Sequence, residues 1–384
     1  MNTLSPKALT ERDKMKGSEL KNFAVHDRNG NVVETDIVFE EQIGKGAFGK
    51  VFKVRMKSGD KGLEDNYCLK ICPVLNGRLT EIDILLRLDS PFILHMMYYK
   101  VLTSPHRIVM ITELMEDDLY KVEHRTTMKG ESLGIYVPLY AFQLFRGLCN
   151  LASHGIMHRD LKPENLLVQH GRGILKIGDF GLAADMNRRS KFGPYVGTRA
   201  FRAPEQLIGT DTYGSEIDIW AAGVVLTEMV LFEPIFSNHG GHVMWKRMVS
   251  ILGWPTEADL NSWKLHPDTK AKYLELKEDQ QQLQRTDTLQ SLFQKLMTAG
   301  QSTVKYVEDR RNLHDLLHQI FVYNTNNRIK GWDAVAHPYF DRLWQRNIRL
   351  PNGNHLPDHL LKFDWTEFGQ MTERAKRKFN PIFP

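Results

Sequence analysis

Two short stretches near the middle of this 384-residue chain constrain its fold and chemistry more than any other feature. They are His158–Asn165, which reads HRDLKPEN, and Ile177–Gly181, which reads IGDFG. They carry two aspartates, Asp160 and Asp179, with a lysine and an asparagine between them. Carboxylate and amide oxygens bind Mg²⁺, and a carboxylate can accept the hydrogen bond of a reacting hydroxyl. A loop of solvated polar residues is the alternative, but two such motifs in this order rarely arise by chance.

The two stretches resemble the catalytic and metal-binding loops of eukaryotic protein kinases. Phosphoryl transfer needs a positioned hydroxyl and metal ions more than covalent help from the protein. The resemblance implies that Asp160 binds the acceptor hydroxyl, Lys162 reaches the moving phosphoryl group, and Asn165 and Asp179 hold Mg²⁺. Tyrosine kinases usually carry an arginine-bearing loop in place of Lys162, so the resemblance implies serine or threonine acceptors.

Composition is that of an ordinary globular protein, with 42% hydrophobic and 25% charged residues. The net charge of +5 is small for this length and gives no reason to expect nucleic-acid binding. Three cysteines without metal-ligand spacing predict a reducing compartment, cytoplasmic or nuclear. The N-terminus has no apolar signal core, and charges interrupt the longest apolar run, so no membrane partner is expected.

A glycine-rich run, Ile43–Val54, stands well upstream of the catalytic stretches. Glycines allow a close approach of the backbone to phosphates, and the alternating apolar residues around them predict a strand, a turn and a second strand. Dinucleotide-binding folds share the pattern, but their glycines open a helix, whereas this run continues as a strand. The resemblance to kinases implies an ATP site that contains the following residues: Ile43, Gly44, Gly46, Gly49, Val51, Cys68, Lys70, Thr112, Glu113, Met115, Asp118 and Leu167.

Lys70 stands where kinases carry the lysine that contacts the α- and β-phosphates, and Glu81 matches its ion-pair partner. The alternative to this functional interpretation is that Lys70 is an ordinary edge or surface lysine and Glu81 an ordinary solvated glutamate. Only 11 residues separate the two positions, so about two turns of the helix that bears Glu81 are missing. Cyclin-dependent kinases bind cyclin through that part of the helix, so a cyclin partner is not expected.

The segment after Asp179 ends in Ala203-Pro204-Glu205, and Arg202 before it is a mark of the CMGC group of kinases. In that group this arginine bonds the carbonyl at the position of Gly197, which adopts a left-handed conformation; an ordinary surface arginine is the alternative. The substrate's next N–H then finds no acceptor, so proline is preferred there. The resemblance therefore implies a substrate pocket at Gly197, Thr198 and Arg202. Tyr195 matches a regulatory tyrosine phosphorylated by an upstream kinase, although a packed, unmodified tyrosine is as good a reading.

The resemblance covers residues 36–342 and is closest to the mitogen-activated and cyclin-dependent kinase-like families of the CMGC group. It implies an α+β, bilobal fold, with a small antiparallel-sheet lobe over 36–114 and a mainly helical lobe over 119–342. A CMGC insert is expected around 235–315, a disordered tail over 1–35 and a C-terminal extension over 343–384. The aromatic residues Phe363, Trp365 and Phe368 of the extension are candidates to dock on the small lobe, as in mitogen-activated kinases. Protein substrates are the expected partners. A pseudokinase or scaffold that acts by protein contact is the rival class.

Overall fold

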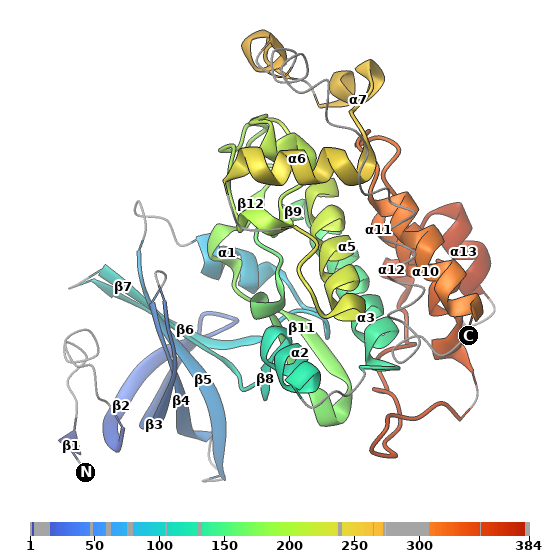
Figure 1. Cartoon of the computed structure of the whole chain (residues 1–384). Coiled ribbons are helices and arrows are strands. Elements are labelled where there is room, and N and C mark those ends of the chain that lie inside the picture. The colour runs from blue at the N-terminus through green and yellow to red at the C-terminus, as the bar shows by residue number, and fades with distance from the viewer. Residues whose placement is uncertain are drawn as a thin grey trace. The chain divides into compact units, whose positions relative to one another are not determined.

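The computed structural model describes residues 2–3, 16–46, 49–58, 63–74, 80–103, 106–128, 133–236, 240–263, 265–271, 273, 307–345 and 347–380. The chain divides into two compact units, Met1–Glu116 and Asp117–Pro384, and each is described by itself (Figure 1). The first unit contains β1 (Asn2–Thr3), β2 (Ser18–Asp27), β3 (Val32–Gly46), β4 (Gly49–Ser58), β5 (Leu63–Pro73), α1 (Thr80–Arg87), β6 (Met96–Thr103) and β7 (His106–Glu113).

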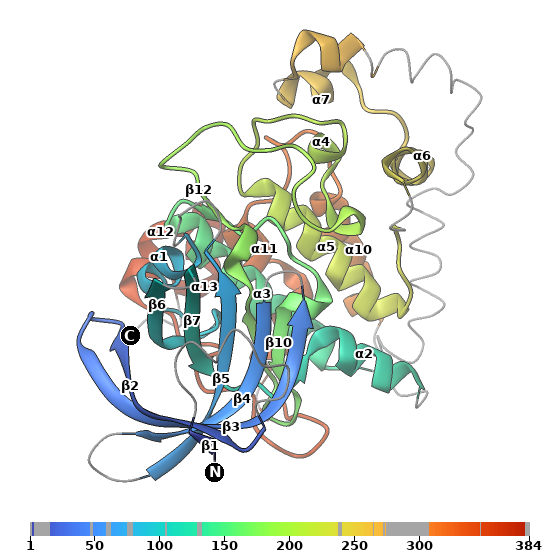
Figure 2. The same ribbon diagram turned by 90° about the vertical axis from the view of Figure 1, so that its left-hand side faces the viewer.

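The first unit is built on one sheet with the strand order β1-β2-β3-β4-β5-β7-β6. Its strands pair antiparallel, apart from the short β1, which runs parallel to β2. The far ends of the sheet also meet, because His26 and Asp27 of β2 pair with Tyr99 and Tyr98 of β6 (Figure 2). Buried side chains from β2 to β7 form one apolar core inside this curled sheet. The predicted antiparallel sheet is therefore present.

The sequence analysis predicts a disordered tail over residues 1–35, and the structure corrects this prediction for the part from Ser18 onward. Ser18–Asp27 and Val32–Gly46 are strands, and Leu20, Phe23 and Val25 are buried in the core of the sheet. The pairing with β3 shifts register between Leu20 and Phe23, where Asn22 has a φ of +50°. This bulge interrupts the alternation of apolar residues, which is the signal that identifies a strand from sequence. Residues 4–15 lie outside the described part.

The second unit is mainly helical, and its elements are as follows: β8 (Asp117–Asp118), α2 (Leu119–Met128), α3 (Tyr136–Ser153), β9 (Ile156–Met157), β10 (Leu166–Gln169), β11 (Ile174–Ile177), β12 (Ala184–Asp185), α4 (Pro204–Leu207), α5 (Glu216–Leu231), α6 (Gly241–Leu252), α7 (Glu257–Ser262), α10 (Val307–Ile320), α11 (Gly331–Val335), α12 (Trp365–Gln370) and α13 (Glu373–Phe379). Two small sheets, β11-β10-β8 and β12-β9, carry the loops of the predicted catalytic stretches.

Helices α3 and α5 form the centre of this unit, and most of their residues are buried. A helix that is apolar on all sides must be covered on all sides. None of the described helices is long and apolar enough to cross a membrane. Within this core Arg328 donates from both terminal nitrogens to the Glu205 carboxylate, at 2.8 and 3.0 Å, and both side chains are almost fully buried. The stretch Asn327-Arg328-Ile329 resembles the kinase pattern whose arginine pairs with this glutamate, so the resemblance implies the same pair, and the structure contains it.

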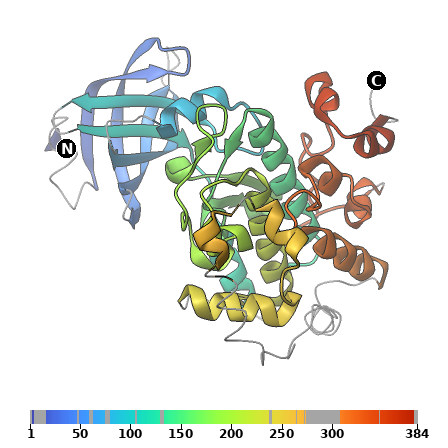
Figure 3. The same ribbon diagram turned by 90° about the horizontal axis from the view of Figure 1, so that it is seen from above.

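The C-terminal extension packs on the second unit, near α10 and α11, as Figures 1 and 3 both show. Arg146 of α3 is buried; its guanidinium donates to the carbonyl of Leu360 and pairs with Glu367 of α12 at 2.5 Å. The same guanidinium lies 4.2 Å from the ring centre of Phe363, which stacks on Phe379 at 4.6 Å. The contacts of Phe363 with Arg146 and Phe379 thus lie within the second unit.

The expected insert around 235–315 contains α6 and α7 before residue 274 and the start of α10 after residue 306. Tryptophan and tyrosine rings fasten this region: Trp245 lies edge-on to Trp263 and to Tyr273. The polar, helix-prone composition of Asp279 to Gln301 predicts an exposed hairpin, and this stretch lies outside the described residues.

We expect Glu367→Ala to lower the free energy of unfolding by about 3 kcal/mol or more, because it leaves the charge of buried Arg146 without its partner. Glu373→Ala is the matched control, since Glu373 is exposed and pairs with Lys376 at 3.1 Å on the surface; its effect should stay below about 1 kcal/mol. Urea unfolding of the three proteins measures both values. Equal effects of the two substitutions would contradict the anchoring role of Arg146.

Candidate active site

Lys70 and Glu81 form an ion pair in the first unit. Lys70 lies on β5 between its neighbours β4 and β7, and its ammonium donates to the Glu81 carboxylate at 2.8 Å. The two side chains are only 18% and 11% exposed. The short spacing does not prevent contact, because α1 begins at Thr80 and Glu81 lies in its first turn. A carboxylate there is also stabilised by the positive end of the helix dipole.

The other predicted nucleotide residues of this unit lie on β3, β4, β5 and β7. Cys68 is directly opposite Thr112 in the β5–β7 pairing, and burial raises the pKa of its thiol. Thr112 donates its hydroxyl to the carbonyl of Glu113 at 3.1 Å, and the Glu113 carboxylate accepts from the N–H of His95 at 2.8 Å. Met115, which follows β7, is partly buried. The thiol of Cys68 thus stays neutral in its strand.

The glycine-rich run forms the β3–β4 hairpin, as predicted, with Gly46 opposite Gly49 and residues 47–48 outside the described part. Ile43 is 44% exposed, and Val51 pairs with Gly44. Gly49 has a φ of +141°, and a Cβ there would lie 2.1 Å from the carbonyl oxygen of Ile71. Gly49 is therefore required by its contact with β5, whatever the hairpin binds.

In the second unit, a buried carboxylate holds the HRDLKPEN loop. Asp218 at the start of α5 accepts the backbone N–H of His158 at 2.7 Å and that of Arg159 at 2.9 Å. Burial raises the pKa of Asp218, and the adjacent His158 and the two N–H donors oppose that shift. The two bonds fix the loop where Arg159 has a φ of +67°. Asp218-Ile219-Trp220 resembles the kinase helix whose aspartate braces this loop, so the resemblance implies the same contact, and the structure contains it.

Asp160, Lys162, Asn165 and Thr198 meet in one hydrogen-bonded group. The Asp160 Oδ1 accepts both the backbone N–H and the hydroxyl of Thr198, each at 2.7 Å. Lys162 lies 3.2 Å from the same hydroxyl and 3.6 Å from Asp160 Oδ2. The Asn165 side-chain nitrogen donates to the Asp160 backbone carbonyl at 2.7 Å. A carboxylate, an ammonium and a hydroxyl are therefore gathered where an acceptor hydroxyl could be oriented.

His158 connects this loop to the one that carries Asp179, a role that the sequence analysis did not assign. Its Nε2 donates to the carbonyl of Gly178 at 2.8 Å, while its Nδ1 accepts the N–H of Asp160. The N–H of Gly178 in turn donates to the carbonyl of Asn165 at 2.9 Å. Asp179 follows with a φ of +54°, and Phe180 packs edge-on against His158. The sequence signal that could have indicated this role is the place of His158 as the first residue of the HRDLKPEN stretch.

The donor set of Asn165 and Asp179 suits Mg²⁺. Because the Asn165 nitrogen is turned toward Asp160, its amide oxygen is the atom that can coordinate a cation. Among the described residues no group of three or more His, Cys, Asp or Glu side chains could hold a metal ion. Mg²⁺ is usually bound by one or two carboxylates, waters and substrate phosphates rather than by a complete protein cage. An asparagine and an aspartate therefore fit a cation that arrives with phosphates.

Arg202 closes on the backbone of the segment before α4. Its guanidinium donates to the carbonyl of Gly197 at 3.0 and 2.6 Å and to that of Val196 at 3.1 Å. Gly197 has a φ of +81°, in the left-handed region that favours glycine. A Cβ on Gly197 would lie 2.1 Å from the carbonyl oxygen of Arg159. The predicted hydrogen bond and backbone conformation are therefore both present, and Gly197 lies against the loop that carries Asp160.

The remaining predicted residues lie at the edges of this group. Tyr195 is 56% exposed with a φ of +61°, and its hydroxyl would lie 2.6 Å from a Cβ on Gly209. Asp118 caps α2, accepting the N–H of Lys121 at 2.9 Å. Leu167 pairs with Asp118 across β8 and β10, and it lies against Gly178. Tyr195 is thus accessible to solvent, whereas the Asp118 carboxylate already caps α2.

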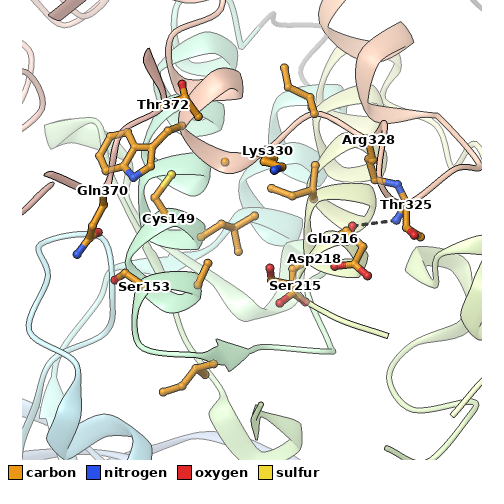
Figure 4. Close-up of a pocket in the computed structure, with 17 residues that line it drawn as sticks. Cys149, Ser153, Ser215, Glu216, Asp218, Thr325, Arg328, Lys330, Gln370 and Thr372 are labelled. Carbon is orange, nitrogen blue, oxygen red and sulfur yellow. Dashed lines mark hydrogen bonds between the residues drawn. The ribbon is translucent and has the colours of Figure 1, made fainter. Parts of the chain in front are cut away.

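A separate pocket of about 460 Å³ opens between α3, α5 and α11 of the second unit (Figure 4). Cys149 and Ser153 line it from α3, and Ser215, Glu216 and Asp218 from the start of α5. Asp218 therefore lines this pocket and also accepts the two N–H groups of the loop that carries Asp160. Burial raises the pKa of Cys149 well above its ordinary value, so the thiol stays protonated and unreactive.

Residues 37–340 match the protein-family model described as the protein kinase domain. The matched range covers both units and contains Lys70, Glu81, Asp160, Asn165 and Asp179.

We expect Gly197→Ala to lower the free energy of unfolding by about 2 kcal/mol or more, because the new Cβ is forced into a left-handed conformation and onto the Arg159 carbonyl. Gly193→Ala in the same segment is the control, since a Cβ there meets only Val196, at an ordinary 3.5 Å. Denaturant unfolding of both variants measures the difference. A Gly197→Ala protein as stable as Gly193→Ala would contradict the packing described at this position.

Proposed function

Since the chain belongs to the protein kinase family, we propose that it is an ATP- and Mg²⁺-dependent protein serine/threonine kinase of the CMGC group, which prefers a proline directly after the phosphorylated residue. The bilobal arrangement of the family, with ATP held by residues of both units, is part of the proposal. The observation that carries its finer part is the Arg202 guanidinium on the carbonyl of Gly197, at 2.6 Å.

The catalytic part of the proposal rests on the group around Asp160. Its carboxylate, fixed by two 2.7 Å bonds from Thr198, would accept the hydrogen bond of the substrate hydroxyl and align it for attack. Lys162, 3.2 Å from the Thr198 hydroxyl, would stabilise charge on the transferred phosphoryl oxygens. A bound Mg²⁺ neutralises phosphate charge, and Asn165 and Asp179 are the residues that would hold it. Lys70, oriented by Glu81, would contact the α- and β-phosphates.

The preference for proline follows from the hydrogen bonds of Arg202. A bound substrate that carries an ordinary residue after the acceptor would present a backbone N–H near Gly197, whose carbonyl already accepts from Arg202. A buried N–H without an acceptor costs about 1–3 kcal/mol. Proline has no N–H, so a proline substrate avoids this cost. The preference thus arises because any other residue after the acceptor binds more weakly, and it needs no special contact to the proline ring.

Regulation at Tyr195 belongs to the same proposal. Its side chain is exposed, and Arg199 and Arg202 follow it in the same segment. A phosphate on this hydroxyl would add close to two negative charges that guanidinium groups can pair with. An upstream kinase is the partner that this site would require.

The first experiment measures transfer of labelled phosphate from Mg-ATP to a Ser-Pro peptide by the wild-type protein and by Asp160→Asn. We expect the substitution to lower kcat by about 10²- to 10⁴-fold, because an amide cannot replace the carboxylate. Asp211→Asn is the control and should leave kcat unchanged, because the Asp211 side chain is 46% exposed and pairs with the exposed Lys191. Equal transfer by wild type and Asp160→Asn would refute the catalytic role and favour a scaffold.

The second experiment compares peptides that differ only in Ser-Pro and Ser-Ala. We expect wild type to favour Ser-Pro by roughly 5- to 100-fold in kcat/KM, the equivalent of one unpaired N–H. Arg202→Ala should reduce this ratio to a few-fold, because the Gly197 carbonyl becomes an acceptor for the Ser-Ala peptide.

Lys191→Ala serves as the control for the loss of a positive charge in this segment, since Lys191 is 77% exposed and pairs with Asp211 on the surface. Its ratio should equal that of wild type. An Arg202→Ala enzyme that keeps the full preference for proline would overturn the argument from the Gly197 carbonyl.

A further inference from the structure

The turn between β2 and β3 contacts the helix that carries Glu81. Arg28 lies in this turn, and its guanidinium donates to the carbonyl of Leu88 at 2.8 Å and, at the longer distance of 3.4 Å, to that of Leu86. These carbonyls stand at the C-terminal end of α1, where backbone acceptors have no partner within the helix. An arginine at this end satisfies them and is attracted by the negative end of the helix dipole.

The turn itself is fixed by its own hydrogen bonds. The Asp27 carboxylate accepts the backbone N–H of Asn29 at 2.9 Å and that of Asn31 at 2.8 Å. Its second oxygen accepts from the Asn31 side chain at 2.9 Å, and Gly30 supplies the positive φ of +85° that the turn requires. Arg28 therefore projects from a rigid support.

The hairpin β2–β3 is held in turn by the far edge of the sheet. His26 and Asp27 pair with β6, and the ring of His26 stacks on Tyr99 with centres 5.4 Å apart. Lys100 of β6 donates to the carbonyl of Ala24 at 2.5 Å, and its ammonium lies 4.4 Å from the ring centre of Phe23. The hairpin thus joins β3, β6 and α1, and β3 is the strand that leads into the glycine-rich turn.

Helix α1 depends on such external support because it has only eight residues. Isolated helices of this length are unstable in water, so tertiary contacts decide where they lie. Its buried residues Ile82, Ile84 and Leu85 hold one face, while Arg28 holds the C-terminal end. Glu81 is five residues from Leu86, a distance of about 8 Å along the helix. Any shift at the C-terminal end is therefore passed to the carboxylate that orients Lys70.

We propose that the N-terminal hairpin is a built-in support for the Lys70–Glu81 ion pair, with Arg28 as a positioning residue that acts through α1. This proposal rests on the proposed kinase function, in which Lys70 contacts the phosphates of ATP. The hairpin holds this short helix in place, so that neither a longer helix nor a partner protein is needed to position Glu81. Arg28 touches neither nucleotide nor substrate, and its effect on catalysis passes entirely through Glu81.

The test compares wild type, Arg28→Ala, Arg28→Lys and the control Lys21→Ala, which removes an exposed positive charge from the same hairpin. Arg28→Ala should lower kcat about tenfold, as the loss of one hydrogen bond would, and leave the KM for the peptide unchanged. Arg28→Lys, which keeps a donor for one carbonyl, should recover part of this loss. Lys21→Ala should behave as wild type.

The same substitution is then made in a Glu81→Gln protein. If Arg28 acts through the ion pair, Arg28→Ala should change the residual kcat of Glu81→Gln less than twofold. A full tenfold loss in this background would show that Arg28 acts independently of the ion pair and would overturn the proposal. Unchanged kcat for Arg28→Ala in the wild-type background would also overturn it.

Amide hydrogen exchange over residues 80–88 separates failure of this proposal from failure of the kinase assignment, because it requires no activity. We expect faster exchange in Arg28→Ala, because the end of α1 has lost its support, and wild-type exchange in Lys21→Ala. Equal exchange in all four proteins would overturn the support role, whatever the protein catalyses. Faster exchange in a protein without phosphate transfer would uphold the support of α1 and refute the proposed function alone.

Discussion

The structure of the second unit depends on one buried carboxylate. Asp218 is 3% exposed, and it accepts two backbone N–H groups of the loop that carries Asp160. A charge in that position is costly unless donors surround it, and α5 supplies the rigid, fully covered element on which it can be held. Breaking either bond would leave a buried acceptor unpaired and release Arg159 from its left-handed conformation. The loop conformation is therefore tied to the core of the unit.

Further hydrogen bonds connect the loop held by Asp218 to its neighbours. His158 donates to the carbonyl of Gly178, which precedes Asp179. Asp160 accepts the N–H of Thr198, in the segment that ends at Arg202. At the end of this series of hydrogen bonds the Gly197 carbonyl accepts from the Arg202 guanidinium. The proposed preference for proline therefore depends on the same hydrogen bonds that hold the loops on the core of the unit.

The sequence predicted those parts of the site that lie in local motifs. The Lys70–Glu81 pair, the Glu205–Arg328 pair and the Arg202–Gly197 bond each follow from short patterns whose residues stand at fixed positions in the kinase family. Contacts without such a pattern could not be predicted. The strand β2 was missed because its bulge at Asn22 breaks the alternation of apolar residues. The contacts of Phe363 with Arg146 and Phe379 could not be predicted either, because an aromatic residue in an extension carries no signal that selects these partners.

The measurement that tests the central claim most directly is phosphoamino-acid analysis of a protein mixture after incubation with this protein and labelled Mg-ATP, with EDTA as the control. We expect label on serine and threonine only, because Lys162 stands where tyrosine kinases usually carry an arginine-bearing loop. We expect no label when EDTA removes the metal. Label that is confined to tyrosine, or transfer that persists in EDTA, would contradict the assignment of the acceptor and the metal. If no protein in the mixture is labelled even when the enzyme carries phosphate on Tyr195, the assignment as a kinase is contradicted.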